Sequence, residues 1–312
     1  MARYYTPLRY PGGKQKLTPF LLEILTANEL VGGHYVEPYA GGAGVALELL
    51  LARHVKKIHL NDSALPVYAF WKALLDHTDE LCKLISCASL TIEEWKRHRE
   101  VVRNPDDSSL LELGFSTFYL NRCNRSGVLS GGVIGGLQQT GEWKMDARFP
   151  RNELIRRIEV IAARKDSIVM KNMDAEDFIA QHVNDLPENT LVYCDPPYFE
   201  KASRLYLNAY GEGDHKRIAG FIQKKLKKKW VVSYDNAPQI LDFYKERRSF
   251  LYDLQYNAST VYKGKEVFVF ADNLKIPGKS ALPYIDEVIR RLPHLAGISV
   301  KTAAAKRSAA HI

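Results

Sequence analysis

The residues best suited to chemistry are Asp195-Pro196-Pro197-Tyr198, which follow the apolar run Leu191–Cys194. Such a run is typical of a buried strand. Two successive prolines fix φ and remove two backbone donors, so the turn is rigid and its carbonyls can accept hydrogen bonds. A carboxylate, a fixed carbonyl and a flat ring at one point suit a planar amino group whose nitrogen attacks a methyl donor. A plain tight turn after a strand is the alternative interpretation.

A second candidate group lies where the strand-like segment ending at Glu37 runs into Ala40, Gly41 and Gly42, ahead of a helical pattern over 45–51. Glycines allow a sharp turn and a close approach of a ligand to the backbone. The spacing matches neither a dinucleotide fingerprint nor a phosphate-binding P-loop. An acidic residue before the turn suits a ligand with an ammonium group better than a pyrophosphate. A glycine-capped turn without a ligand is the alternative.

Two acidic groups follow later strand-like runs. Asp62 comes roughly 20 residues after the glycine turn, where nucleoside-binding folds accept hydrogen bonds from ribose hydroxyls. Asp177 and Phe178 offer an acceptor for an adenine amino group and a ring to cover one face of the base. Helix capping explains Asp62 equally well, and Asp174 is an equally good N-cap before Asp177.

The N-terminal segment contributes Tyr10 and Lys14, separated by Pro-Gly-Gly. This turn chemistry holds the lysine at a defined place. The tyrosine four residues earlier is suited to lie against a flat ligand.

Short strand-like runs alternate with helical patterns, which indicates an α/β fold with a mostly parallel, doubly wound sheet. In such sheets ligands bind beyond the carboxyl ends of the strands, so the four groups are expected to meet there. The expected strands are His34–Glu37, Lys57–Leu60, Ser167–Lys171, Leu191–Cys194, Trp230–Tyr234, Phe250–Gln255 and Glu266–Phe270.

A long segment of different character interrupts this alternation. Helical patterns over 65–75, 91–102 and 110–120 precede a glycine-rich, aperiodic stretch over 121–150, and aperiodic stretches of this length are usually functional or disordered. We therefore expect a catalytic domain over 1–64 and 161–285, an inserted recognition domain over 65–160, and a C-terminal extension over 286–312 with a disordered end. The candidate base-reading residues, each equally explained as a phosphate contact or a surface residue, are Asn121, Arg122, Arg125, Gln138 and Gln139.

Composition narrows the class of protein. The net charge of +8 favours a polyanionic partner such as DNA. No apolar run approaches the roughly 18 residues that cross a bilayer, and the N-terminus lacks a signal-peptide core. The four cysteines show no metal-ligand or disulfide spacing. These features predict a reduced, cytoplasmic protein with neither a metal nor a membrane partner.

The order of PLRYPGGK, YVEPYAGGAG, HLND, NRCNRSG, LVYCDPPYF and KGKEVFVF over residues 7 to 270 resembles the Dam-type DNA adenine-N6 methyltransferases, the D12 class. The resemblance implies a Rossmann-like fold and S-adenosyl-L-methionine as methyl donor. It implies that the donor is contacted by Tyr10, Lys14, Glu37, Ala40, Gly41, Gly42, Asp62, Asp177, Phe178 and Asp195. Tyr10 replaces the tryptophan of the best-known members, and the 121–141 stretch matches their recognition loops only in part.

The expected activity is site-specific methylation of the exocyclic amine of an adenine flipped out of double-stranded DNA, since an amine inside a duplex is out of reach. Asp195 and the Pro196 carbonyl hold the amine, the prolines keep the turn rigid, and Tyr198 replaces the lost stacking. A restriction endonuclease is an expected functional partner. Cytosine-N4 methylation, a protein or RNA amide methyltransferase, and a non-catalytic DNA-binding module are the alternatives.

Overall fold

A computed structural model of the chain describes residues 5–9, 14–199, 210–257 and 261–277. These residues form a seven-stranded sheet in the order β3-β2-β1-β4-β5-β7-β6. Strands β1 to β5 run parallel, whereas β7 is antiparallel to both β5 and β6. The strands are β1 (His34–Glu37), β2 (Lys57–Asn61), β3 (Ile168–Lys171), β4 (Thr190–Cys194), β5 (Lys229–Asp235), β6 (Arg248–Asn257) and β7 (Val261–Phe270).

The expected α/β class and mostly parallel, doubly wound sheet are confirmed. All seven expected strands are present. The ends differ most at β6 and β7, which pair as an antiparallel hairpin over their whole length, so β7 begins at Val261 rather than at Glu266. The order of the strands reverses between β1 and β4, which places the switch point beside the glycine turn and the Asp-Pro-Pro-Tyr turn.

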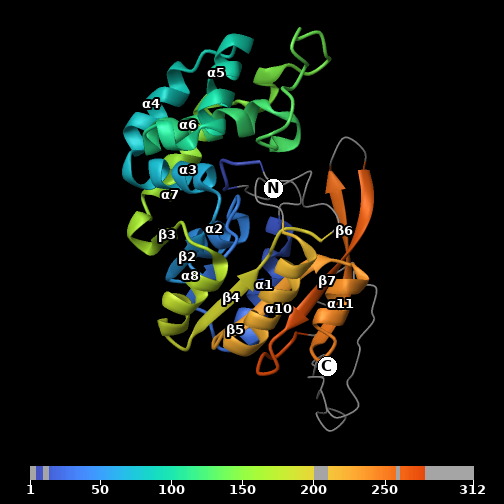
Figure 1. Cartoon of the computed structure of the whole chain (residues 1–312). Coiled ribbons are helices and arrows are strands. Elements are labelled where there is room, and N and C mark those ends of the chain that lie inside the picture. Colours follow the sequence, from blue (N-terminus) through green and yellow to red (C-terminus); the bar gives the residue numbers. More distant parts are fainter. Residues whose placement is uncertain (1–4, 10–13, 200–209, 258–260, 278–312) are drawn as a thin grey trace, which may run out of the picture.

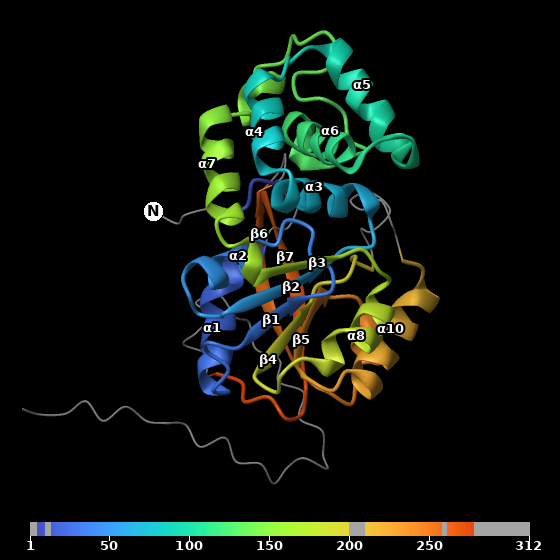
Figure 2. The ribbon, with the colours of Figure 1, turned by 90° about the vertical axis from the view of Figure 1, so that its left-hand side faces the viewer.

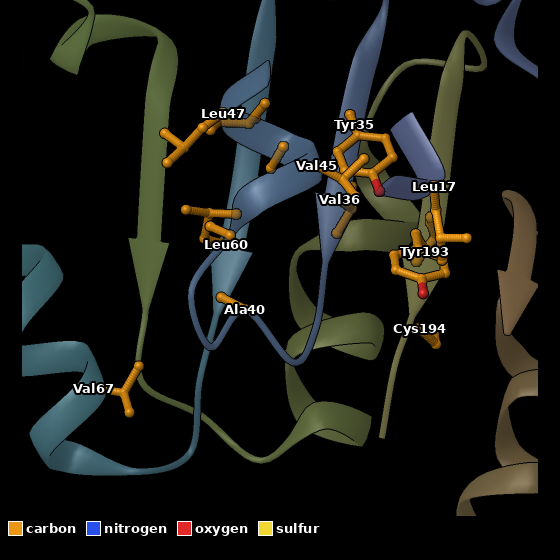
Figure 3. Close-up of a cluster of buried hydrophobic side chains, with 14 of the residues drawn as sticks. Leu17, Tyr35, Val36, Ala40, Val45, Leu47, Leu60, Val67, Tyr193 and Cys194 are labelled. Atoms are coloured by element: carbon orange, nitrogen blue, oxygen red, sulfur yellow. The ribbon is translucent and has the colours of Figure 1, made fainter. Parts of the chain in front are cut away.

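Helices cover both faces of the sheet (Figure 2). Helices α1 (Thr18–Ala27) and α2 (Gly44–Leu51) lie on one face, and α8 (Ala175–Gln181) and α10 (Glu212–Lys225) lie on the other. Helix α11 (Pro238–Phe243) lies beside α10 (Figure 1). Figure 3 shows Val45 and Leu47 of α2 against Val36 and Leu60, all fully or almost fully buried. Burial of this kind stabilises the fold by about 1.5–3 kcal/mol for each large aliphatic side chain.

Five further helices gather beyond the carboxyl ends of the strands, at the top of Figure 1. Gly114 permits the close packing of two of them, because a Cβ there would come within 2.5 Å of the Ala69 carbonyl oxygen. Thr91 and Ser109 cap two of the helices by accepting the amides of Glu94 and Glu112. The five are α3 (Leu65–Asp76), α4 (Thr78–Cys87), α5 (Ile92–Arg103), α6 (Leu110–Cys123) and α7 (Arg151–Ala162).

The segment between α6 and α7 forms short turns rather than regular structure. Ser126 and Gln139 adopt left-handed conformations there, with φ of 56° and 50°. The division into a catalytic unit and a unit over 65–160 stays a prediction, and the expected extension over 286–312 lies outside the described residues. The 3₁₀ turns of the chain include η1 (Lys14–Leu17), η2 (Pro105–Asp107), η3 (Arg125–Gly127), η4 (Met145–Arg148), η5 (Lys165–Ser167) and η6 (Val183–Asp185).

None of the helices within these described ranges is long and apolar enough to span a bilayer. Nor do three or more histidine, cysteine, aspartate or glutamate side chains gather into a metal-binding group there.

Candidate active site

Asp195 stands directly after β4, where the apolar strand ends and the two buried prolines begin. Its Oδ1 accepts the Ser233 hydroxyl at 2.7 Å and lies 3.4 Å from the Lys14 ammonium nitrogen. No described residue bonds Oδ2. The side chain is 22% exposed, which makes it more open than Lys14 at 8%. One carboxylate oxygen is therefore fixed by the protein, and the other can receive a donor from outside.

Burial raises the pKa of Asp195 to about 6. Lys14 lowers this pKa, and the nearby Glu266 carboxylate raises it again. The group is ionised at neutral pH and can be protonated by mild acid. Only the ionised carboxylate offers both oxygens purely as acceptors, so the capacity of Asp195 to receive donors is greatest above about pH 6.

Lys14 is the centre of a buried polar cluster that joins distant parts of the chain. Its ammonium nitrogen lies 2.5 Å from Glu266 Oε2 and 2.9 Å from the Tyr198 hydroxyl. The Tyr198 hydroxyl donates to Glu266 Oε1 at 2.6 Å, and the Tyr252 hydroxyl donates to Oε2. The structure thus brings the expected residues Lys14, Asp195 and Tyr198 together, with Glu266 as a partner that the sequence did not predict.

The Asp-Pro-Pro-Tyr turn itself is well anchored. Pro196, Pro197 and Tyr198 are buried, and the Phe199 amide donates to Asp235 Oδ1 at 2.8 Å. Tyr198 is only 2% exposed, and its hydroxyl joins the Lys14 cluster. Stacking of Tyr198 on an extruded base stays a prediction.

The glycine turn after β1 is braced from two sides. Asp62 Oδ2 accepts the Gly41 amide at 2.9 Å, and the Trp71 indole of α3 donates to the Gly41 carbonyl at 2.9 Å. Gly41 has φ of 45° and Ala43 has φ of 47°, conformations that glycine adopts freely and alanine rarely. Ala40 and Gly42 are buried within this turn. Asp62 also accepts the Ala64 amide ahead of α3, but the N-cap of that helix is Ala64 and has no side-chain cap, so Asp62 braces the turn and does not cap the helix.

Glu37 and Asp62 form an acidic rim at the ends of β1 and β2. Burial raises the pKa of Glu37 to about 8 and that of Asp62 to about 6, against smaller lowering by hydrogen bonds. Glu37 accepts the Ala46 amide at 3.2 Å. No basic side chain among the described residues pairs with either carboxyl group. Buried carboxyl groups of this kind favour a ligand that brings positive charge or several hydrogen-bond donors, because such a ligand stabilises their ionised form.

In the group after β3, the placement of Phe178 differs from the expected one. Asp174 caps α8 by accepting the Glu176 amide at 2.8 Å, and Asp177 is exposed on the first turn. Phe178 is fully buried and stacks on His182, because Ala175, Phe178 and Ile179 form the inward face of α8. The ring of Phe178 is not available to a ligand in this structure. Tyr10 lies outside the described residues.

Three of the five candidate base-reading residues are engaged inside the protein, contrary to expectation. The Asn121 side chain accepts the Arg9 amide at 2.7 Å and donates to the carbonyls of Arg9 and Gly127. Arg122 is buried and donates to the Arg148 and Pro7 carbonyls. Both side chains bond buried backbone groups, which need hydrogen-bond partners, and they are therefore not available to read bases.

Gln139 serves its own loop in the same way, through the Ile134 and Gly136 carbonyls and the Met145 amide. Arg125 and Gln138, by contrast, are exposed. Only these two of the five side chains face solvent as a DNA-reading role requires.

Sequence reasoning missed Ser233, Glu266 and Trp71. Ser233 and Glu266 lie within segments with a strand pattern. A single polar residue in such a segment is usually interpreted as a side chain on the solvent-facing side of the strand. Trp71 reads as an apolar position of a helix. The KGKEVFVF block was the one available signal for Glu266, since it belongs to the motif series that carried the family resemblance.

Comparison with protein families gives a match to the D12 class N6 adenine-specific DNA methyltransferase family over residues 10–259. Comparison with curated protein sequences gives no match. Among solved structures, a conserved hypothetical protein from Streptococcus pyogenes is similar at 12% identity and a TM-score of 0.29, covering 78% of this chain and 90% of that one.

Two further solved structures are similar. The rRNA methyltransferase AviRa from Streptomyces viridochromogenes has 14% identity and a TM-score of 0.35, with 84% of this chain and 86% of that one covered. A modification subunit of a putative type I restriction enzyme from Vibrio vulnificus has 10% identity and a TM-score of 0.35, with coverages of 82% and 43%.

Proposed function

From the premise that the chain belongs to the D12 class N6 adenine-specific DNA methyltransferases, we propose that it methylates the exocyclic amine of an adenine flipped out of double-stranded DNA, with S-adenosyl-L-methionine as donor. The family match makes the protein a DNA-methylating enzyme of the expected Rossmann-like methyltransferase fold. The identity of the donor, the flipping of the base and the roles of single residues belong to the proposal.

The observation that carries the proposal is the asymmetry of the Asp195 carboxylate. Oδ1 is held by Ser233 and faces Lys14, whereas Oδ2 is bonded by no described residue. An adenine amine has two N–H bonds and a lone pair delocalised into the ring. Acceptance of these N–H bonds by Asp195 Oδ2 and the Pro196 carbonyl draws the nitrogen toward a tetrahedral shape and frees the lone pair for attack.

Charge supports the same role for Asp195. Positive charge develops on the amine as its nitrogen gains a fourth substituent while the methyl–sulfur bond breaks, and a fixed carboxylate beside it stabilises that charge. Loss of one amine proton then gives the neutral product. The proline turn keeps the carboxylate in place without further reorganisation, which is the condition for a large effect from positioning.

The acidic rim fits S-adenosyl-L-methionine by the chemistry of its donors. Glu37, without a basic partner, suits the ammonium group, and Asp62 suits ribose hydroxyls beside the glycine turn. The methionine end is expected along Ala40, Gly41 and Gly42, with Asp177 near the adenine. When bound, the donor supplies an electrophilic methyl group on a sulfonium centre.

The insertion over 65–160 is proposed to meet the DNA. Arg125 and Gln138 remain as base-reading candidates, since both are exposed on the segment between α6 and α7. Four arginines lie near one another here, because Arg9, Arg157 and Arg148 all act on Arg122. Burial is the largest cause that lowers the pKa of Arg122 to about 9, and the positive charges of these three arginines lower it further. Concentrated positive charge of this kind attracts phosphates and releases their counterions.

The test is to incubate the purified protein with S-adenosyl-L-methionine labelled in its methyl group and a set of defined duplexes, and to identify the modified nucleoside. N6-methyladenine is the expected product. N4-methylcytosine would support the cytosine alternative, labelled protein or RNA the amide one, and binding without any label the non-catalytic module. A cytoplasmic location and a cognate restriction endonuclease stay predictions.

A further inference from the structure

Glu266 lies at the centre of the site although its strand, β7, is at the far side of the sheet from the cofactor-binding turns. It is 1% exposed, and its neighbours across the sheet are Asp235 on β5 and Tyr252 on β6. The donors to its two carboxylate oxygens include Lys14, Tyr198 and Tyr252. A buried carboxylate with this many donors is held in one position.

The distances show how Lys14 divides its charge between two acids. Lys14 lies 2.5 Å from Glu266 and 3.4 Å from Asp195. Glu266 therefore takes the close ion pair, and Asp195 receives only the weaker, longer contact. Without a second acid, the ammonium group would close on Asp195 and compete with the substrate amine for the same carboxylate.

We infer that Glu266 is a positioning residue of the methyl-transfer site, which withholds Lys14 from Asp195 and fixes the ring of Tyr198 through its hydroxyl. Glu266 does not touch the substrate in this account. It acts through Lys14 and Tyr198. Because Glu266 holds the Lys14 ammonium group, the Asp195 carboxylate keeps its position and its negative charge for the substrate amine. The inference rests on the proposed function, because it assigns Asp195 the role of amine acceptor.

The electrostatics agree with this geometry. Burial alone would raise the pKa of Glu266, but Lys14 and the three hydrogen bonds outweigh it and lower the value, so Glu266 is ionised. Glu266 in turn raises the pKa of Asp195. Among the described residues, the other titratable or polar groups near this pair include Glu37 and Tyr35 from β1, Tyr193 and Cys194 from β4, Ser233 and Asp235 from β5, and Tyr252 from β6.

The pH dependence separates positioning from a merely structural role. With Glu266→Gln, one negative charge leaves and Lys14 is free to approach Asp195. The Asp195 carboxyl then ionises more easily, and the acid limb of kcat/KM is expected to move down by about 1–2 pH units. Turnover at pH 8 is expected to fall by about 100-fold, since Asp195 and Tyr198 lose their alignment.

Glu188→Gln is the matched control. Glu188 also pairs with a buried lysine, Lys228, at 2.6 Å, but this pair lies at the opposite ends of β4 and β5 from the site. Its acid limb and turnover are expected to equal those of the wild type. Circular dichroism and thermal melting of each variant establish that it is folded.

Glu266→Asp keeps the charge on a shorter arm. Positioning predicts turnover reduced by at least about tenfold with an acid limb close to that of the wild type. This variant keeps the inference testable even if Glu266→Gln does not fold, because wild-type turnover in Glu266→Asp would overturn it. An unshifted acid limb in folded Glu266→Gln would overturn it as well. Failure of the wild type to methylate adenine would instead refute the proposed function.

Discussion

The Asp62 carboxylate accepts the Gly41 amide at 2.9 Å, so the end of β2 fixes the turn that follows β1. The same carboxylate accepts the Ala64 amide at 3.0 Å, which starts the chain toward α3. Trp71 of α3 then returns to the Gly41 carbonyl. The proposed cofactor turn is thus held by contacts from the end of β2 and from α3, the helix that follows β2, so its conformation is set before a ligand binds.

Asp62→Ala is expected to weaken binding of S-adenosyl-L-methionine by roughly 10- to 100-fold, because it removes both the turn brace and an acceptor. In the wild type, affinity is expected to decline as the pH falls below about 6, where Asp62 takes up a proton. Titration calorimetry without DNA measures both effects. Unchanged affinity in the folded variant would contradict the placement of the ligand.

Glu37→Gln is expected to raise stability while lowering cofactor affinity. The folded-state pKa of Glu37, about 8, lies above its ordinary value of 4.5, so the folded state holds the proton more tightly. Wild-type stability therefore declines as the pH rises from about 4.5 through 8, and the neutral variant escapes this loss. The melting temperature is expected to rise by about 5 °C at pH 9 and hardly at all at pH 4.

Glu23→Gln is the control for this change, since Glu23 is exposed on α1. Its melting temperature is expected to follow the wild type at every pH. If Glu37→Gln and the wild type have the same melting temperature at pH 9, burial does not raise the pKa of the Glu37 carboxyl.

Asn121→Ala is expected to destabilise the protein rather than change its choice of DNA site. Its amide serves three backbone groups, at Arg9 and Gly127, and leaving buried groups without partners costs about 3 kcal/mol in total. Denaturant unfolding measures the loss. A stable variant with altered site choice would restore Asn121 to the base-reading set.

Arg125→Ala and Gln138→Ala are expected to show the opposite behaviour. Both side chains are exposed, so the free energy of unfolding is expected to change by less than about 0.5 kcal/mol. A base contact by either is worth about 1–3 kcal/mol of discrimination, visible as relaxed site choice in methylation of a randomised duplex library. Uniformly weaker binding to all sequences would indicate a phosphate contact instead.

His59 is expected to make the protein sensitive to acid. Its ring nitrogens bond His34 and His182 at 2.9 Å each, and a second proton on the ring would oppose one of these bonds. Burial, then the neighbouring histidines, lower its pKa to about 3, so the unfolded chain binds a proton that the folded chain does not. Stability is therefore lost as the pH falls from about 6.5 toward 3.

In the His59→Asn variant, the slope of unfolding free energy against pH over this range is expected to decrease by up to about 1.4 kcal/mol per pH unit. His77→Asn is the control, since the His77 side chain is about half exposed at 49%. Equal slopes for the two variants, measured by urea unfolding, would show that the three-histidine chain does not carry the acid sensitivity.

The fold was predictable where the pattern of apolar and polar residues along a segment matches the burial of that segment in the folded protein. Leu191–Cys194 reads as a strand because every side chain is apolar and both faces of the sheet are covered. Asn121 and Arg122 were predictable only by residue type, and residue type suits DNA as well as a backbone carbonyl. Their partners Arg9 and Pro7 are 112 and 115 positions away, so no local pattern distinguishes the two uses.

The same distance limit explains Glu266. Its partner Lys14 is 252 positions away and comes close only when β7 joins the sheet beside β5. Phe178 shows the reverse error, because an aromatic beside an acidic residue resembles a base-binding pair, whereas helical spacing turns the ring inward. The motifs thus predicted which segments meet at the candidate site, and packing decided which of their side chains are buried elsewhere.

The most direct test of Asp195 as the amine acceptor is single-turnover methylation by Asp195→Ala, measured beside its affinity for the same duplex. The expected result is loss of adenine methylation with DNA binding close to that of the wild type. Turnover at the wild-type rate in this variant would contradict the central role of the carboxylate.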